Sequence, residues 1–126
     1  MIHYIRQPYF SKLCGQTCVA MILGIKLAEA IKLVGHTRGT RTAELTRVLN
    51  RNGCKCANKL TRIEKDKGYP KRSLLKMNFY DDDNKKIGTG HWVICWDGKV
   101  YDPDPPPLGV WPNCKITAYV EIEKDG

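Results

Sequence analysis

Hydrophobic positions in the first half of the chain repeat with the spacing of amphipathic helices. In residues 11–25, apolar side chains at positions 14, 18, 21, 22 and 25 form one helical stripe. Ser11 is a good N-cap residue, so we expect this helix to place Cys14 in its first turn. Two further helices are predicted over 27–35, with Gly35 as the stop, and over 41–53. In the third helix, the apolar residues at 45, 48 and 49 should face inward.

The second half alternates with the period of β-strands. Strands are predicted over 54–60, 74–80 and 115–123, while 62–72 and 81–90 are predicted to be loops or turns. A chain of 126 residues suits one domain. Helices followed by an antiparallel sheet indicate an α+β fold, with a helical half over 1–53 and a sheet half over 54–126.

The strongest local signal is a hairpin over 91–103, in which two β-rich runs flank Asp97-Gly98. A two-residue turn there sets the pairs Trp96–Lys99, Cys95–Val100 and Ile94–Tyr101. Continued further, the same ladder places Asp104 opposite His91 and Asp102 on the diagonal. Either carboxylate could hold the imidazole by one ring nitrogen and leave the other free as a base. A surface His–Asp pair without catalytic function is an equally good explanation of the hairpin alone.

Cys14 and Cys18 begin the first apolar run and call for different interpretations. The partial positive charge of a helix N-terminus favours a thiolate, and Cys14 occupies that place. Cys18 lies one turn further along the apolar stripe and is interpreted as core. Gly15 would let a substrate backbone approach the sulfur. The side-chain amide of Gln7, with the backbone N–H of Cys14, could form an oxyanion hole.

Composition and charge narrow the function classes. A hydrophobic content of 42% argues against disorder, and no apolar run is long enough to span a membrane. The N-terminus lacks the layout of a signal peptide, so we expect a cytoplasmic protein with reduced cysteines. Residues 1–76 carry 16 basic and 4 acidic side chains, and residues 77–126 carry 5 and 9. The basic half, including 51–76, could meet nucleic acid or an acidic partner, although a solvated surface is the simpler interpretation.

Two other classes compete with catalysis. Cys14, Cys18, Cys54 and Cys56 could form a four-cysteine zinc site, but two of them lie along a helix and the other pair is tightly spaced. Residues 42–53 resemble part of a helix-turn-helix, which would suit nucleic-acid binding, but no recognition helix follows. A binding module without catalysis, for nucleic acid or protein, therefore stands as the alternative function.

The order Gln, Cys-Gly at a helix start, late His before a strand and Asp soon after resembles that of papain-like cysteine peptidases. "CGQTCVAMI" and "HWVICWDGKVYDP" are similar to the Cys and His boxes of the bacteriocin-processing peptidase domains of ABC exporters and their free-standing relatives. The resemblance covers residues 3–25 and 88–104 and implies a bacterial or phage source. The family's usual spacing from Gln to Cys is one residue shorter than here.

The resemblance implies a papain-like fold and a thiol-dependent hydrolase. It makes Cys14 the nucleophile, His91 the general base and acid, Asp102 the residue that orients His91, and Gln7 the oxyanion donor. Pro103 also favours Asp102, because it should break the ladder and carry Asp104 toward solvent. We expect a peptide or protein substrate, for which the basic half suggests acidic character, and neither a cofactor nor a metal. Transfer of the acyl group to an amine instead of water is the other chemistry open to the same triad.

Overall fold

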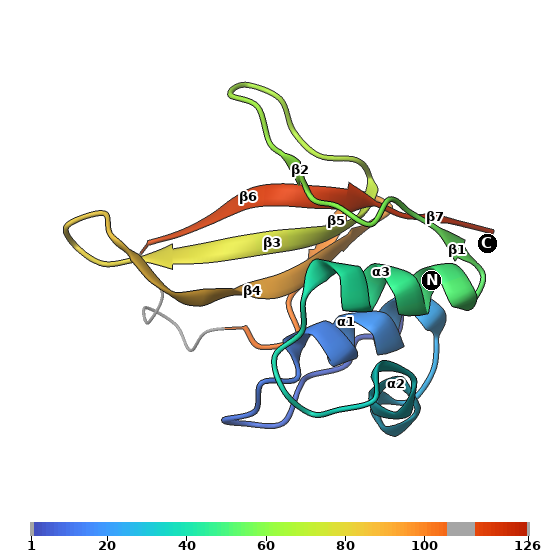
Figure 1. Cartoon of the computed structure of the whole chain (residues 1–126). Coiled ribbons are helices and arrows are strands. Elements are labelled where there is room, and N and C mark those ends of the chain that lie inside the picture. Colours follow the sequence, from blue (N-terminus) through green and yellow to red (C-terminus); the bar gives the residue numbers. More distant parts are fainter. Residues whose placement is uncertain (1, 106–112, 126) are drawn as a thin grey trace.

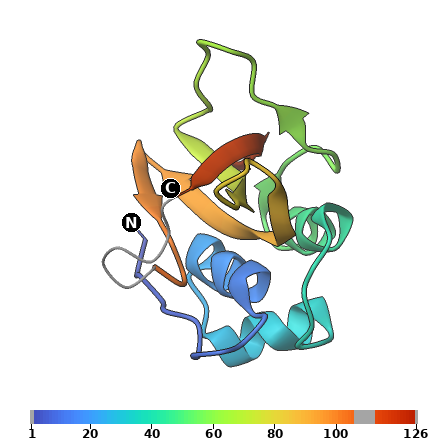
Figure 2. The ribbon, with the colours of Figure 1, turned by 90° about the vertical axis from the view of Figure 1, so that its left-hand side faces the viewer.

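The computed structural model describes residues 2–105 and 113–125, in which three helices cover one face of an antiparallel sheet (Figures 1 and 2). Helix α1 lies between α2 and the sheet, and α3 runs beside it along the same face. The mixed α+β class predicted from the sequence is confirmed. The helices are α1 (Cys14–Leu23), α2 (Leu27–Val34) and α3 (Thr42–Arg51).

The main sheet has five strands in the order β2-β6-β3-β4-β5, and β1 and β7 form a separate two-stranded sheet. Every pairing is antiparallel. The strands are β1 (Cys54–Lys55), β2 (Thr61–Arg62), β3 (Arg72–Tyr80), β4 (Lys86–Trp96), β5 (Lys99–Tyr101), β6 (Cys114–Glu121) and β7 (Glu123–Lys124).

Alternation along β4 divides its side chains between two cores. Trp92, Ile94 and Trp96 join the main core with the buried residues of α1 and α3, while Val93 and Cys95 pack in a smaller cluster with Leu75. Cys18 is fully buried in the main core, as predicted. The inward-facing positions predicted for the third helix, 45, 48 and 49, are also buried.

The β4–β5 hairpin has the predicted register for all three pairs nearest the turn. Asp97 and Gly98 have φ values of 52° and 86°, the left-handed pair that a tight two-residue turn requires. The ladder ends at Tyr101, so Asp102 and Asp104 leave the strand before they can pair with β4. His91 consequently lies on a stretch of β4 that has no strand partner on that side within the described residues.

Three local predictions are wrong. The helix begins after Leu13 as N-cap, without a side-chain cap, because the Ser11 hydroxyl and carbonyl instead accept hydrogen bonds from Gln7. Residues 86–90 are part of β4, and Lys86 and Ile87 pair with β3, although a loop or turn was predicted over 81–90. Strand β2 falls at the start of the basic stretch predicted to be irregular, and it pairs with β6. The segment that follows β2 projects away from the sheet (Figure 1).

None of the helices in the described part of the chain combines the length and apolar character needed to cross a membrane.

Candidate active site

Cys14 is the first residue of α1, where backbone N–H groups have no partner within the helix. Its sulfur is half-buried. The His91 side chain and the backbone N–H groups of Trp92 and Gly15 are near enough to this sulfur to lower the pKa of the thiol. The helix start and β4 therefore meet at this sulfur, which brings together two residues 77 positions apart in the sequence.

Asp102, and not Asp104, contacts the imidazole of His91. His91 Nε2 and Asp102 Oδ1 are 2.6 Å apart, and the two side chains are only 10% and 20% exposed. Since Nε2 faces the carboxylate, Nδ1 is the ring nitrogen left for the Cys14 sulfur. His91 thus lies between the two other side chains: it is hydrogen-bonded to Asp102 and near enough to Cys14 for each to shift the pKa of the other.

The N-terminal segment fixes the backbone that carries Asp102. The Tyr4 hydroxyl donates to the Asp102 carbonyl over 2.6 Å, and the Gln7 backbone N–H donates to the Pro103 carbonyl over 2.8 Å. The Asp104 backbone N–H donates to Asp102 Oδ1 over 2.9 Å. This last bond turns the chain back toward the site, so Asp104 is half-buried. The expectation that it points into solvent is wrong.

The surroundings of Cys14 and His91 favour their charged forms. Burial alone would raise the pKa of Cys14, but the hydrogen bonds from His91 and from the Trp92 and Gly15 amides outweigh it and lower that pKa. Burial would likewise lower the pKa of His91, yet the hydrogen bonds with Asp102 and Cys14 raise it to about 9. Both shifts favour the thiolate–imidazolium pair over the neutral thiol and imidazole.

Gln7 is buried beside this pair, but its amide already has partners. Its Nε2 donates to the Ser11 carbonyl over 3.1 Å and to the Ser11 hydroxyl over 3.2 Å, while its Oε1 is buried without a hydrogen-bond partner. The structure thus brings Gln7 to the site and directs its two amide hydrogens to Ser11. To donate to an oxyanion, the amide must release one of these bonds.

A cavity of about 500 Å³ opens over the sulfur. The cavity is lined by Cys14, His91, Gln7 and Ser11, and by residues of the neighbouring strands β3 and β4. Its other lining residues are Lys12, Gly39, Thr40, Arg41, Lys76, Thr89, Gly90, Trp92 and Asp104. The catalytic candidates therefore face a space large enough for a few residues of an extended peptide.

The loop over 36–41, of which residues 39–41 form a wall of the cavity, is held by the helix that carries Cys14. Fully buried Gln16 donates from Nε2 to the carbonyls of His36 and Arg38 over 3.0 and 2.9 Å. His36 accepts from the Arg38 N–H at Nδ1 and faces Glu44 with Nε2 at 2.5 Å. His36 is therefore a structural histidine of this loop, and Gln16 is a positioning residue that the sequence analysis missed.

Gly15 has a different function from the one predicted. It is buried against this wall, and a Cβ added to it would lie 2.0 Å from Thr40 Oγ1 and 3.1 Å from Leu45 Cδ2. The absence of a side chain lets α1 pack against the wall. It does not open a path for substrate to the sulfur.

The described part of the chain contains no cluster of ligands that would support a four-cysteine zinc site. Cys14 and Cys18 lie on α1, and Cys54 lies on β1 with Cys56 just beyond it. Among residues 2–105 and 113–125, no three side chains of His, Cys, Asp or Glu are grouped closely enough to hold a metal ion. All six cysteines are free thiols.

Comparison with known proteins adds no relative: no protein-family model matches this chain, and no curated protein sequence matches it.

Proposed function

We propose that this chain is a papain-like cysteine peptidase or amidase, with Cys14, His91 and Asp102 as its catalytic residues. The observation that carries the proposal is that Cys14 and His91 line the same open cavity and affect each other's pKa, while Asp102 holds the His91 imidazole by a 2.6 Å hydrogen bond. A structural His–Asp pair would need neither a thiol at a helix N-terminus nor access to such a cavity.

In this mechanism the Cys14 thiolate attacks the carbonyl carbon of a peptide or amide bond. As the C–N bond breaks, the His91 imidazolium gives its proton to the leaving amine, and a thioester remains on Cys14. His91, now neutral, takes a proton from water as the water oxygen attacks the thioester. The C–S bond then breaks, which releases the carboxylic acid product and restores the Cys14 thiolate and the His91 imidazolium.

Developing negative charge on the carbonyl oxygen needs hydrogen-bond donors. The Cys14 backbone N–H is placed for this at the start of α1, where it has no helical acceptor. Gln7 is the second candidate, because it lines the same cavity and its Nε2 can exchange the weaker of its two bonds to Ser11 for the oxyanion.

Peptide profiling tests the proposal without knowledge of the natural substrate. The protein is incubated at pH 7 with a peptide library prepared from a whole proteome, and new termini are identified by mass spectrometry. We expect new termini with the wild type and with Cys114→Ser, which changes an exposed cysteine that does not line the cavity. None should form with Cys14→Ser or His91→Ala. Equal termini from the wild type and Cys14→Ser would refute the proposal.

A further inference from the structure

The cavity over Cys14 carries an excess of positive charge. Three cationic side chains line it, Lys12, Arg41 and Lys76, against the single carboxylate of Asp104. The Cys14–His91 pair adds no net charge when both are ionised. Lys12 and Arg41 are exposed at the rim, whereas Lys76 is half-buried beside the sulfur.

Lys76 is held in this place by the strand next to it. It pairs with Trp92 across the β3–β4 ladder, and its Nζ lies 4.4 Å from the centre of the Trp92 ring. Its stem passes over Gly90, where an added Cβ would come within 2.9 Å of Lys76 Cε. Gly90 and Trp92 flank His91, so the same three residues of β4 position both the imidazole and the lysine.

The position of this cation determines what it can recognise. Lys76 and Cys14 line the same cavity, so the lysine faces the space that a substrate carbonyl must enter to reach the sulfur. A carboxylate next to the scissile bond could therefore pair with the Lys76 ammonium while the carbonyl carbon meets Cys14. Such a pair is partly shielded from water, which makes it stronger than an exposed one.

We propose that the site selects acyl substrates that carry a carboxylate beside the scissile bond, such as an acidic side chain or a free carboxyl group, and that Lys76 is the residue that recognises it. This specificity rests on the proposed function, because it concerns the group that Cys14 attacks. Part of the net positive charge of the first half of the chain then has a function at the cavity and does not serve only to solvate the surface.

Two small alkylating reagents test the inference without a known substrate. Iodoacetate and iodoacetamide react in the same way: the thiolate sulfur bonds to the methylene carbon of the reagent, and iodide leaves. The two reagents differ chiefly in the charge of the group that is transferred. The rate at Cys14 is measured for each by mass spectrometry, and the ratio is compared with that of the neutral model thiol N-acetylcysteine amide. A change in thiolate content affects both reagents equally and cancels in the ratio.

We expect the iodoacetate-to-iodoacetamide ratio at Cys14 to exceed the model-thiol ratio by about threefold or more, as for a partly shielded charge pair. Lys76→Met should bring it down to the model value, and Lys76→Arg should keep it raised. Lys99→Met is the matched control, because Lys99 also lies over an aromatic ring, Tyr101 at 5.2 Å, but does not line the cavity.

The outcomes separate the two proposals. If both reagents modify Cys14 ahead of the other cysteines but the ratio equals that of the model thiol, or is the same in the wild type and Lys76→Met, the carboxylate specificity is wrong and the proposed function stands. If neither reagent prefers Cys14, the proposed function fails and the specificity fails with it.

Discussion

Asp102→Asn tests whether the carboxylate stabilises the charged form of His91. The pKa of His91 rises from 6.5 to about 9. At about 1.4 kcal/mol per pKa unit, this difference corresponds to roughly 3 kcal/mol in favour of the imidazolium. The hydrogen bond with Asp102 contributes more to the rise than the one with Cys14. We therefore expect Asp102→Asn to lower the pKa of His91 by about 1 to 2, equivalent to roughly 1.4 to 2.7 kcal/mol.

The assay is an NMR titration of the His91 imidazole in the wild type and the variant. Asp104→Asn is the control, because Asp104 lines the cavity but contacts Asp102 through its backbone N–H, which the substitution keeps. We expect Asp104→Asn to leave the pKa of His91 within about 0.5 of the wild-type value, since the Asp104 carboxylate is not among the groups that shift this pKa. A wild-type pKa near 6.5, or equal shifts in the two variants, would refute the reasoning.

The same pair makes a signed prediction for stability. A histidine whose pKa is raised by folding stabilises the protein fully below its unfolded pKa, and this stabilisation is lost as the pH rises through the folded pKa. Urea titrations should therefore show a larger difference in free energy of unfolding at pH 6 than at pH 10 between the wild type and Asp102→Asn. A larger difference at pH 10 would contradict the assignment of a charged His91.

Three further predictions follow from the site and its support. Gly15→Ala should lower the free energy of unfolding by about 1–3 kcal/mol, because the added methyl group clashes with Thr40. Gly39→Ala should change it little, because a Cβ there would meet nothing within 4 Å. Urea titration measures both values. At pH 6 iodoacetamide should modify Cys14 before the other five cysteines, by peptide mapping, and uniform slow labelling would contradict the ion pair. Elemental analysis should find no stoichiometric zinc, and chelators should not change the melting temperature; one zinc per chain would revive the four-cysteine site.

The parts of the fold that sequence could predict are those set by local chemistry. Asp97-Gly98 demands a left-handed turn, and this alone sets the register of the hairpin. The spacing of apolar residues predicted the three helices, because each has one face on the core. Cys14 was predicted to lie in the first turn of a helix capped by Ser11; it does lie there, although the N-cap is Leu13.

The parts that could not be predicted depend on contacts between distant segments. Lys76 gives no local signal, since its place beside Cys14 follows from the pairing of β3 with β4. Tyr4 reaches Asp102 across 98 positions in the sequence, and Gly15 is small because of Thr40, which lies on another segment. Asp104 turns toward the cavity through one backbone hydrogen bond that alternation along a strand cannot foresee.

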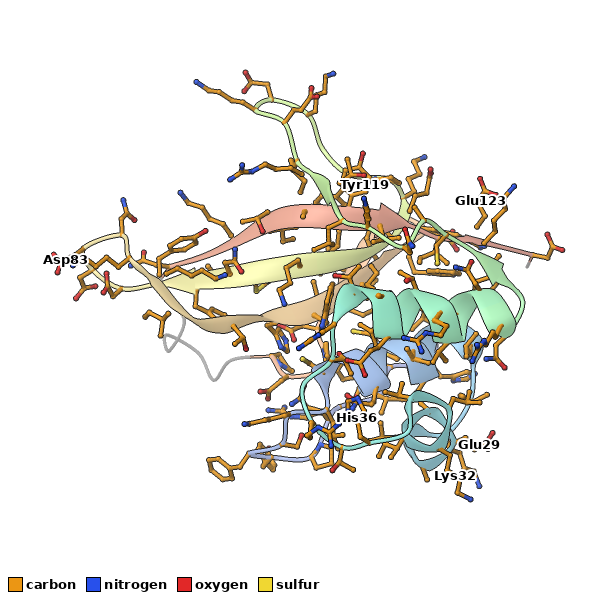
Figure 3. All side chains as sticks on the ribbon, in the orientation of Figure 1. Glu29, Lys32, His36, Asp83, Tyr119 and Glu123 are labelled. Carbon is orange, nitrogen blue, oxygen red and sulfur yellow. The ribbon has the colours of Figure 1, made fainter. Side chains whose placement is uncertain are left out.

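Charged side chains also project from the outer parts of the molecule, as Glu29, Lys32 and Asp83 do in Figure 3. These three include both acidic and basic groups, whereas the cavity lining has three cations and one carboxylate. The local excess at the cavity is therefore the charge feature with a defined place in the proposed chemistry.

The most direct test of the central claim is detection of an acyl thioester on Cys14. The wild type is mixed with a proteome-derived peptide library and quenched with acid at short times, and the peptide that contains Cys14 is examined by mass spectrometry before and after hydroxylamine. We predict added masses that match acyl fragments of library peptides, that hydroxylamine removes, and that are absent in Cys14→Ser. New peptide termini formed at an equal rate by Cys14→Ser, with no acyl group on Cys14 of the wild type at any time, would contradict the account.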